Sequence, residues 1–162
     1  MSSKEMSVFP IGYVRVIDAG FCLAIEPEYR QALRGLEGFS HINVIWWCHG
    51  CDDAAARTVL ECEQPYKQSP AKLGIFATRS PLRPNPIAIT AVMALKLDVA
   101  RGLIVIPYID AEDGTPILDI KPYHPSVDRI RDVSVPAWCR HWPQWYEDSA
   151  DFDWGAEFVN AH

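Results

Sequence analysis

Short runs of β-branched and aromatic residues, separated by turn signals, recur through most of this chain. Runs of this kind, bounded by glycine, proline or aspartate, predict short β-strands. Many short strands with few helices are typical of a small closed or nearly closed barrel. The expected strands are Phe9–Ile17, Phe21–Ile25, His41–Cys48, Ile75–Thr78, Ile87–Leu97, Leu103–Ile109 and Ile117–Ile120.

The connections between these runs also carry signals. Asp18–Gly20 and Asp98–Gly102 contain the aspartate and glycine typical of tight turns, so each is expected to join two neighbouring strands. Helical composition predicts a short helix over Glu28–Leu36. A second short helix is expected over Asp53–Cys62, with Asp52 as its N-cap. The fold is therefore expected to be mainly β, with a few short helices.

The length and composition are those of one globular domain. The 162 residues are 49% hydrophobic and 22% charged, an ordinary balance for a folded chain. We expect a single domain over residues 1–162, with the barrel over about residues 8–125. The remaining aromatic and acidic extension, about residues 135–162, is too apolar to be a free tail. It is expected to pack on the barrel or on a partner subunit, with a platform for a nucleobase as the alternative.

Charge and hydropathy restrict the partners. A net charge of −6 argues against a protein that coats nucleic acid. Between Arg57 and Lys96, however, six basic residues face two acidic ones, and a local basic surface attracts phosphate or carboxylate groups. No apolar run reaches the roughly 18 residues of a membrane span. The polar start has no signal-peptide core, so we expect a cytoplasmic protein without membrane contact.

The cysteines are odd in number and irregularly spaced, which predicts free thiols in a reducing compartment. Cys48-His49-Gly50-Cys51 contains zinc-ligand types. No second Cys-x-x-Cys follows, and Cys48 belongs to an apolar run in which cysteine is often simply core. No metal is therefore expected, and a metal-binding structural protein is a minor alternative.

The first segment with chemical potential is GIFATRSPLRPNPI, residues 74–87. Its three prolines restrict the backbone before any ligand binds. Its two arginines, Arg79 and Arg83, offer planar forks that suit a carboxylate or phosphate. Such a segment can form a preorganised anion or nucleotide site. The alternative is a rigid surface loop whose arginines pair with nearby carboxylates.

The second segment is DAEDGTPILDIKPY, residues 110–123. Asp113-Gly114 is a turn signal, and carboxylates near a turn can accept ribose hydroxyls or hold a cationic group. Asp119 and Lys121 are two apart in an expected strand and therefore share a face. The alternative is a hairpin whose polar residues only shape the turn.

Together, GIFATRSPLRPNPI, DGTPILDIKPY and the element GLEGFSH resemble the signatures of the TsaA-like family. That family contains S-adenosylmethionine-dependent methyltransferases built on a small antiparallel β-barrel. The resemblance implies a homodimer with the cofactor near the subunit interface. It also implies a substrate such as N6-threonylcarbamoyladenosine beside the tRNA anticodon, or a related small molecule.

Three features depart from the family pattern, one of which is Ala88, where members usually have glycine after Asn-Pro-Ile. Members usually carry an extended segment with a Pro-x-Gln element after the first strand, whereas here Asp18–Gly20 turns directly. The tRNA-modifying members also tend to have a further C-terminal domain, whereas this chain ends in the tryptophan-rich acidic extension. The departures bear on how the pocket is closed and on which substrate is methylated.

The resemblance assigns site residues by position in the motifs. Asp113, Asp119 and Lys121 are the expected catalytic residues, with one carboxylate or His49 as the base. Arg79 is expected to bind the methionine carboxylate or to orient the adenine of the cofactor. The expected cofactor-binding residues are His49, Gly50, Phe76, Thr78, Arg79, Ser80, Arg83, Asn85, Ile89, Ala91, Ile109, Asp110 and Glu112.

The expected reaction is direct displacement at the activated methyl group. Nucleophile and methyl carbon must be held in line and about 3 Å apart, and no metal is needed. The competing hypothesis from another class is a non-catalytic module that senses S-adenosylmethionine or a nucleoside through its dimer interface.

Overall fold

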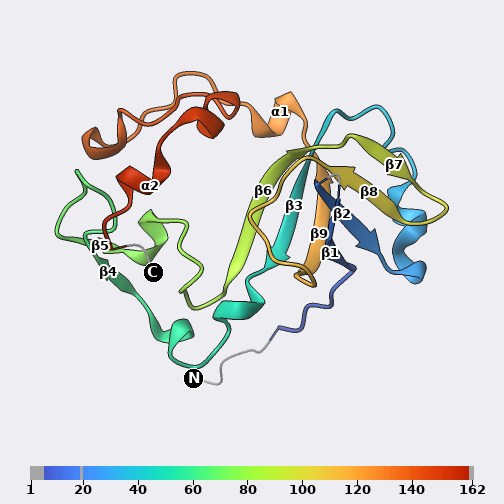
Figure 1. Cartoon of the computed structure of the whole chain (residues 1–162), viewed down its shortest axis with the longest axis horizontal. Helices are drawn as coiled ribbons and strands as arrows, with labels where there is room; N and C mark the ends of the chain where they lie inside the picture. The colour runs from blue at the N-terminus through green and yellow to red at the C-terminus, as the bar shows by residue number, and fades with distance from the viewer. Residues whose placement is uncertain (1–5, 19, 161–162) are drawn as a thin grey trace. The chain divides into compact units, whose positions relative to one another are not determined.

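The computed structural model describes residues 6–18 and 20–160 (Figure 1). Its backbone contacts divide the chain into two compact units. Unit 1 contains Met1–Gly50 and Ile87–Arg129, and unit 2 contains Cys51–Pro86 and Ile130–His162. No linker or change of composition in the sequence predicts this division. The single domain over residues 1–162 remains a prediction.

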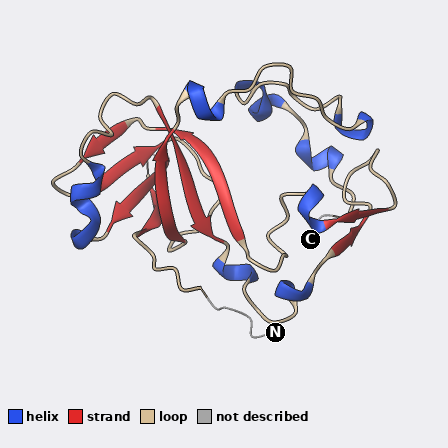
Figure 2. Ribbon diagram, turned by 180° about the vertical axis from the view of Figure 1, so that it is seen from behind, coloured by secondary structure: helices blue, strands red, loops and turns tan. Residues whose placement is uncertain are grey.

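Unit 1 is built on an antiparallel sheet, which has seven strands within the described residues (Figure 2). Helical segments are few and short, so the prediction of a mainly β chain with few helices is confirmed. In spatial order the strands are β6 (Ile87–Met93), β3 (His41–Trp47), β9 (Pro116–Pro122), β1 (Gly12–Ile17), β2 (Gly20–Ile25), β8 (Leu103–Ile106) and β7 (Lys96–Asp98).

Prolines and short connections set the strand ends. The first strand begins at Gly12, later than the predicted Phe9, because Pro10 has no N–H for a ladder. β8 ends at Ile106 for the same reason, since Pro107 follows it. The β1–β2 hairpin is as tight as the sequence indicates, because Ile17 pairs with Gly20. Ala19, within this turn, lies outside the described residues.

The core of unit 1 follows the alternation of the strands. Side chains that point to the same face of the sheet are fully buried, whereas their neighbours along each strand are not. A 3₁₀ helix over Pro27–Leu33 adds Leu33 to this core, where a longer helix to Leu36 was predicted. The buried cluster contains Val14, Leu23, Ile25, Leu33, Ile42, Val44, Trp46, Val92, Ile104, Ile106, Ile109 and Ile117.

Unit 2 has little regular structure. A two-stranded antiparallel ribbon pairs β4 (Glu61–Glu63) with β5 (Lys72–Gly74). The other elements are the four-residue helix α2 (Trp154–Glu157) and single 3₁₀ turns. A second four-residue helix, α1 (Pro125–Asp128), belongs to unit 1. The 3₁₀ turns of unit 2 lie at Ala56–Thr58, Ile75–Ala77, Ala137–Cys139 and Glu147–Asp151, and a further turn, His49–Cys51, begins in unit 1.

Two predicted elements in unit 2 are wrong. The helix predicted over Asp53–Cys62 is one 3₁₀ turn, Ala56–Thr58, and Cys62 lies in β4. The predicted cap is also wrong, because the N-cap is Ala55 and Asp52 pairs with Arg57. The Asp53 carboxylate accepts the N–H groups of Ala55 and Ala56 just before the turn. The strand predicted over residues 75–78 is a 3₁₀ turn closed by the bond from the Thr78 N–H to the Ile75 carbonyl.

The aromatic extension packs on the segment Cys51–Pro86. Trp138 stacks on Tyr66 with ring centroids 5.5 Å apart, and Trp142 meets the same ring edge-on at 4.8 Å. The Tyr66 backbone also bridges to Phe158. Sequence analysis predicted packing on the barrel or a partner. The contacts described here are instead with this segment of unit 2, and they bury Tyr66.

One carboxylate lies inside this aromatic cluster. Glu157 is 4% exposed and accepts hydrogen bonds from His141 Nε2 at 3.1 Å and Trp142 Nε1 at 3.0 Å. Burial opposes ionisation of the Glu157 carboxyl, but these two bonds and the nearby His141 outweigh burial, so its pKa is held below the usual value. Glu157 therefore ties the ends of the extension together.

Candidate functional site

The Asp113-Gly114 turn of unit 1 is fixed onto strand β1. Gly114 has a φ of +81°, which glycine adopts without strain, and its N–H bonds to the Val14 carbonyl at 2.8 Å. The Asp113 carboxylate accepts the Val16 N–H at 2.9 Å, and Arg15 Nη1 lies 3.7 Å from its other oxygen. The Asp113 side chain is nevertheless 58% exposed, so it shapes the turn and still faces solvent.

His49 lies beside this turn. Trp46 pairs with Ile117, so the end of β3 adjoins the start of β9. His49 Nδ1 lies 3.4 Å from the Thr115 hydroxyl oxygen, and both His49 and Gly50 are exposed. Thr115, by contrast, is 1% exposed. Sequence analysis did not select Thr115, although its place in the DGTP motif was the available signal.

The residues before the turn divide by exposure. Asp110 and Glu112 are exposed, whereas Ile109 is 1% exposed and its side chain belongs to the core. Ile109 therefore offers a ligand almost no exposed surface. The Glu112 carbonyl accepts the Thr115 N–H at 3.2 Å, which closes the turn. The carboxylates of Asp110 and Glu112 remain on the surface next to the turn.

Further along the sheet, β6, β3 and β9 bring four predicted residues onto one face. Directly opposed residues of antiparallel strands point to the same side. The opposite side carries the buried Val44 and Trp46, and Ile89 is 48% exposed, so this is the outer face. Two rows cross it, Ile89–Ile45–Asp119 and Ala91–Asn43–Lys121.

Asp119 and Lys121 form an ion pair on that face, as their spacing predicted. Lys121 Nζ lies 2.8 Å from the carboxylate of Asp119, whose other oxygen accepts the Ile120 N–H. The hydrogen bond with Asp119 and its charge raise the pKa of the Lys121 ammonium. The pair is exposed, so each group remains accessible from solvent.

In unit 2, Arg83 holds the signature loop from within. Its Nε donates to the Ser80 carbonyl at 2.7 Å, and its Nη2 donates to the carbonyls of Thr78 at 2.6 Å and Ile75 at 3.3 Å. The Thr78 hydroxyl adds a bond to the Ile75 carbonyl and accepts the Ser80 N–H. These partners of Arg83 are backbone carbonyls rather than the carboxylates of the alternative hypothesis.

A second arginine supports the same loop from outside it. Arg57 Nε donates to the Pro84 carbonyl at 3.1 Å, and its Nη1 lies 2.9 Å from the Asp52 carboxylate. Sequence analysis counted Arg57 only as a basic residue, because no motif marks it. With Arg83, it fixes both ends of the proline-rich stretch.

The loop presents several predicted cofactor-binding side chains to the surface of unit 2. Phe76 is 79% exposed, which is unusual for a large aromatic side chain, and Arg79 and Asn85 are exposed. Thr78 is buried, and Ser80 is half-buried with its hydroxyl accepting the Leu82 N–H. The exposed members are therefore those able to meet a ligand.

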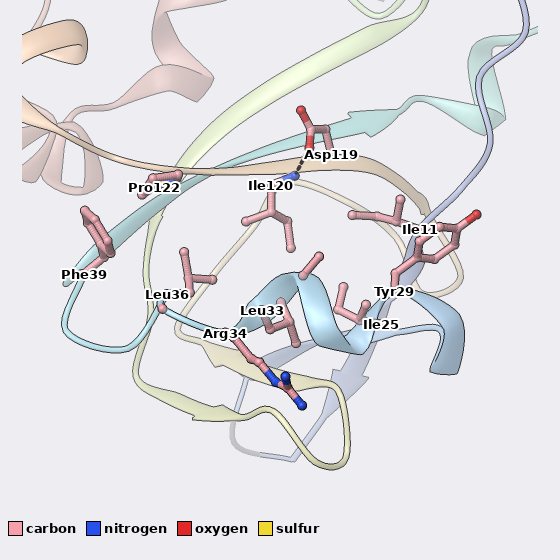
Figure 3. Close-up of a pocket in the computed structure, with 12 residues that line it drawn as sticks. Ile11, Ile25, Tyr29, Leu33, Arg34, Leu36, Phe39, Asp119, Ile120 and Pro122 are labelled. Carbon is pink, nitrogen blue, oxygen red and sulfur yellow. Dashed lines mark hydrogen bonds between the residues drawn. The ribbon is translucent and has the colours of Figure 1, made fainter.

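A separate apolar cavity of about 300 Å³ lies in unit 1 (Figure 3). Leu33 and Ile120 face each other across it, and Leu36 and Phe39 of the GLEGFSH element add to its wall. Of the predicted site residues only Asp119 lines it, and its carboxylate lies on the other side of β9 from Ile120. The cavity does not gather the predicted cofactor-binding residues.

In the described part of the chain, no three His, Cys, Asp or Glu side chains are grouped as a metal site would require. Within the same residues, every helix is too short or too polar to cross a membrane. The five cysteines are free.

Comparison with known families agrees with the motifs. Residues 4–129 match the model of the tRNA-methyltransferase O N-terminal domain. The chain belongs to this family. The match covers both signature segments and confirms the resemblance to the TsaA-like proteins.

Named relatives of this family fall into two groups. An S-adenosyl-L-methionine-binding protein of Archaeoglobus fulgidus is 37% identical, with 74% of this chain and 80% of the relative aligned. A probable S-adenosyl-L-methionine-binding protein of Methanothermobacter thermautotrophicus is 35% identical, with 80% and 98% aligned. The tRNA (adenine(37)-N6)-methyltransferase of Escherichia coli is also 35% identical, over 76% of this chain but 53% of its own length.

Solved structures show the same fold. The crystal structure of TrmO from Pseudomonas aeruginosa superposes with a TM-score of 0.60 at 30% identity. The match covers 80% of this chain and 61% of the TrmO chain. The chain therefore corresponds to less than two thirds of the solved protein.

Proposed function

We propose that this chain is an S-adenosylmethionine-dependent methyltransferase that acts on a nitrogen of adenine in tRNA. The observation that carries the proposal is the family match over residues 4–129, which includes both signature segments. Relatives named tRNA (adenine(37)-N6)-methyltransferase, at 35–38% identity, support the reaction and point to adenine 37 as the target. The small-molecule acceptor expected from the sequence remains the alternative substrate.

The exposed side chains provide the groups that the cofactor requires. Carboxylates of Asp110 and Glu112 suit ribose hydroxyls or an ammonium group, and the Arg79 guanidinium suits the methionine carboxylate. Apolar side chains of Ile89 and Ala91 suit the adenine or the thioether region. The proposed cofactor-binding set is His49, Gly50, Phe76, Thr78, Arg79, Ser80, Asn85, Ile89, Ala91, Ile109, Asp110 and Glu112. Arg83, which the family motif also assigns to this set, instead donates to carbonyls of its own loop.

The proposed reaction moves one methyl group and one proton. Bound S-adenosylmethionine supplies a methyl group on a positively charged sulfur, which needs no metal to react. The acceptor nitrogen forms the new bond to carbon and loses its proton, and S-adenosylhomocysteine is left. The protein's part is to align the two reactants and to accept the proton.

Asp113, Asp119 and Lys121 are the proposed catalytic residues. Asp113 favours the role of base, because it is exposed and lies two residues from Thr115, which contacts His49. Asp119 is paired with Lys121 at 2.8 Å, an arrangement that favours a role in binding or orienting the substrate. Replacement of Asp113 by Asn keeps an oxygen for the Val16 N–H and removes the basicity. Turnover should then fall with folding intact.

The second candidate is a non-catalytic S-adenosylmethionine sensor. Relatives that align over 80–98% of their length are named as binding proteins, whereas those named as methyltransferases align over 53% or less. Both candidates predict cofactor binding. Only the enzyme produces S-adenosylhomocysteine when it is given tRNA.

The test is therefore turnover. Purified protein is incubated with S-adenosylmethionine and tRNA from cells that lack the corresponding activity, and S-adenosylhomocysteine is measured. Production that depends on tRNA and is lost in Arg79→Ala, but kept in Arg101→Ala, supports the enzyme. Arg101 is a matched control because its side chain is 78% exposed and pairs only loosely with Asp98, at 3.8 Å. Binding without product would favour the sensor.

The sheet of unit 1 is proposed to close into a barrel. Its two outermost strands, β6 and β7, are consecutive in the chain and are joined by Ala94 and Leu95. The Ala94 N–H donates to Ser40 beside β3, and the Leu95 N–H donates to Val105 on β8. The same stretch of chain thus bonds to both ends of the sheet, which supports closure.

A homodimer is also proposed. Apolar side chains of β6, and Leu95 two residues beyond its end, are partly exposed: Ile87 at 42%, Ile89 at 48%, Met93 at 44% and Leu95 at 53%. A contiguous apolar row on a strand is typical of a surface that is covered in the assembled protein. A sedimentation measurement that gives only monomer at assay concentration would contradict the homodimer.

A tRNA substrate also fits the cytoplasmic location expected from the sequence.

A further inference from the structure

The family motif predicts that Arg83 binds a ligand, but the hydrogen bonds of its guanidinium indicate a structural role. Three of its hydrogen bonds, of 2.6, 2.7 and 3.3 Å, go to carbonyls of its own loop. A side chain with its donors directed at the backbone has few left for a ligand. Arg83 is also half-buried, whereas Arg79, four residues earlier, is exposed.

The three acceptors bracket the exposed part of the loop. The carbonyls of Ile75 and Thr78 stand on either side of Phe76, and those of Thr78 and Ser80 stand on either side of Arg79. Ile75 is 2% exposed and Thr78 is 8% exposed, so the loop is anchored at these positions. The guanidinium therefore fixes where the Phe76 and Arg79 side chains leave the backbone.

We infer that Arg83 is a positioning residue that holds Arg79 and Phe76 in their ligand-binding arrangement, and that it does not itself bind the cofactor. The inference rests on the proposed function. Between regular elements a loop must find partners for its carbonyls, and its prolines cannot supply N–H groups. One planar fork with several donors supplies partners for three carbonyls at once. A loop ordered in advance loses less conformational entropy when the ligand binds.

Replacing Arg83 by Lys tests the inference, because the charge is kept and the planar fork is lost. The dissociation constant for S-adenosylmethionine, measured by calorimetry, should rise about tenfold, with the binding stoichiometry unchanged. A residue needed only for folding would lower the stoichiometry and leave the dissociation constant as it is. Arg101→Lys removes an exposed guanidinium in unit 1 and should change neither value. Arg83→Gln, which is shorter and loses the charge as well as the fork, should raise the dissociation constant at least as much as Arg83→Lys.

A second measurement needs no ligand. Trypsin cleaves after Arg79, whereas the bond after residue 83 is protected in every variant because Pro84 follows it. Cleavage at the bond from Arg79 to Ser80 should be faster in Arg83→Lys than in wild type, and unchanged in Arg101→Lys. Unchanged cleavage together with unchanged affinity would overturn the role of Arg83 and leave the proposed function intact. If wild-type protein binds no S-adenosylmethionine, the proposed function is overturned. The claim that Arg83 positions ligand-binding side chains then fails as well, even if trypsin cleaves Arg83→Lys faster than wild type.

Discussion

The two signature segments are held in place by different kinds of bond. Residues 115–123 run through β9, whose backbone pairs with β3 on one side and with β1 on the other. Residues 74–86 contain one 3₁₀ turn and are held chiefly by side chains, above all by Arg83 and Arg57. Both segments match their family motifs equally well, so the motif alone does not reveal how each is supported.

The difference teaches where single substitutions should act. A ladder of backbone bonds is made by every residue of a strand, so the sheet depends mainly on what its side chains bury. A loop without a ladder depends on a few side-chain donors, and each of them matters for geometry. Substitutions in β9 should therefore lower stability, whereas substitutions in the loop should alter ligand affinity with smaller effects on stability.

The largest effect is expected from Ile117→Ala in β9. Ile117 is 0% exposed within the core of unit 1, and removing a buried isoleucine side chain typically costs about 2–5 kcal/mol. The free energy of unfolding, measured in urea, should fall by that amount. Ile130→Ala is the control, since Ile130 is 74% exposed and should change stability by less than about 0.5 kcal/mol. Equal losses of unfolding free energy in Ile117→Ala and Ile130→Ala would contradict the claim that β9 is stabilised by the side chains it buries.

Arg79→Ala should show the opposite pattern. Affinity for S-adenosylmethionine should fall at least about tenfold, or about 1.4 kcal/mol, because the exposed guanidinium is the proposed partner of the cofactor carboxylate. The unfolding midpoint should stay at the wild-type value. Calorimetric titration beside thermal unfolding measures both, and an unchanged affinity would remove Arg79 from the site.

Substitutions of Asp113 test whether the turn before β9 is held by backbone hydrogen bonds alone. Its carboxylate accepts the Val16 N–H, so Asp113→Ala should cost about 1 kcal/mol of unfolding free energy. Asp113→Asn should retain most of that stability, since its side-chain oxygen can accept the same bond. If both variants unfold like wild type in urea, the carboxylate has no structural role.

The smallest effect is expected from Glu157 as the pH is lowered. Its pKa is depressed in the folded chain, so its stabilising contribution is complete above the ordinary glutamate pKa of about 4.3. That contribution is lost as the pH falls below this value through the depressed pKa. The free energy of unfolding, followed by tryptophan fluorescence in urea, should therefore fall more steeply below about pH 4.3 in wild type than in Glu157→Gln, which lacks this carboxylate and is already less stable at neutral pH. Identical profiles would contradict the role of Glu157.

Much of unit 1 could be predicted from its residues. Runs of β-branched and aromatic residues predicted strands at β3, β6 and β9. The Asp119–Lys121 pair followed from their spacing in a strand. The division into two units could not be predicted, since it depends on contacts such as Tyr66 with Trp138, residues far apart in the sequence.

The candidate site was predictable by motif, but the roles of its members were not. Arg79 and Arg83 are the same residue type in one loop, and the structure separates them by exposure: Arg79 is exposed, whereas Arg83 is half-buried and donates to carbonyls of the loop. Arg57 was missed because no motif marks it, and Thr115 was missed because only the aspartate and glycine of the DGTP motif were interpreted. Ile75–Thr78 resembles a strand in composition, yet side-chain bonds to its carbonyls favour a turn.

The most direct test of the account follows the methyl group itself. The purified protein is incubated with isotope-labelled S-adenosylmethionine and tRNA that lacks the modification, and the nucleosides are separated and identified by mass spectrometry. The account predicts labelled methyl on the N6 nitrogen of the adenosine at position 37, absent with Arg79→Ala and present with Arg101→Ala. Tight binding of S-adenosylmethionine with no label in any nucleoside would contradict it and identify the protein as a sensor.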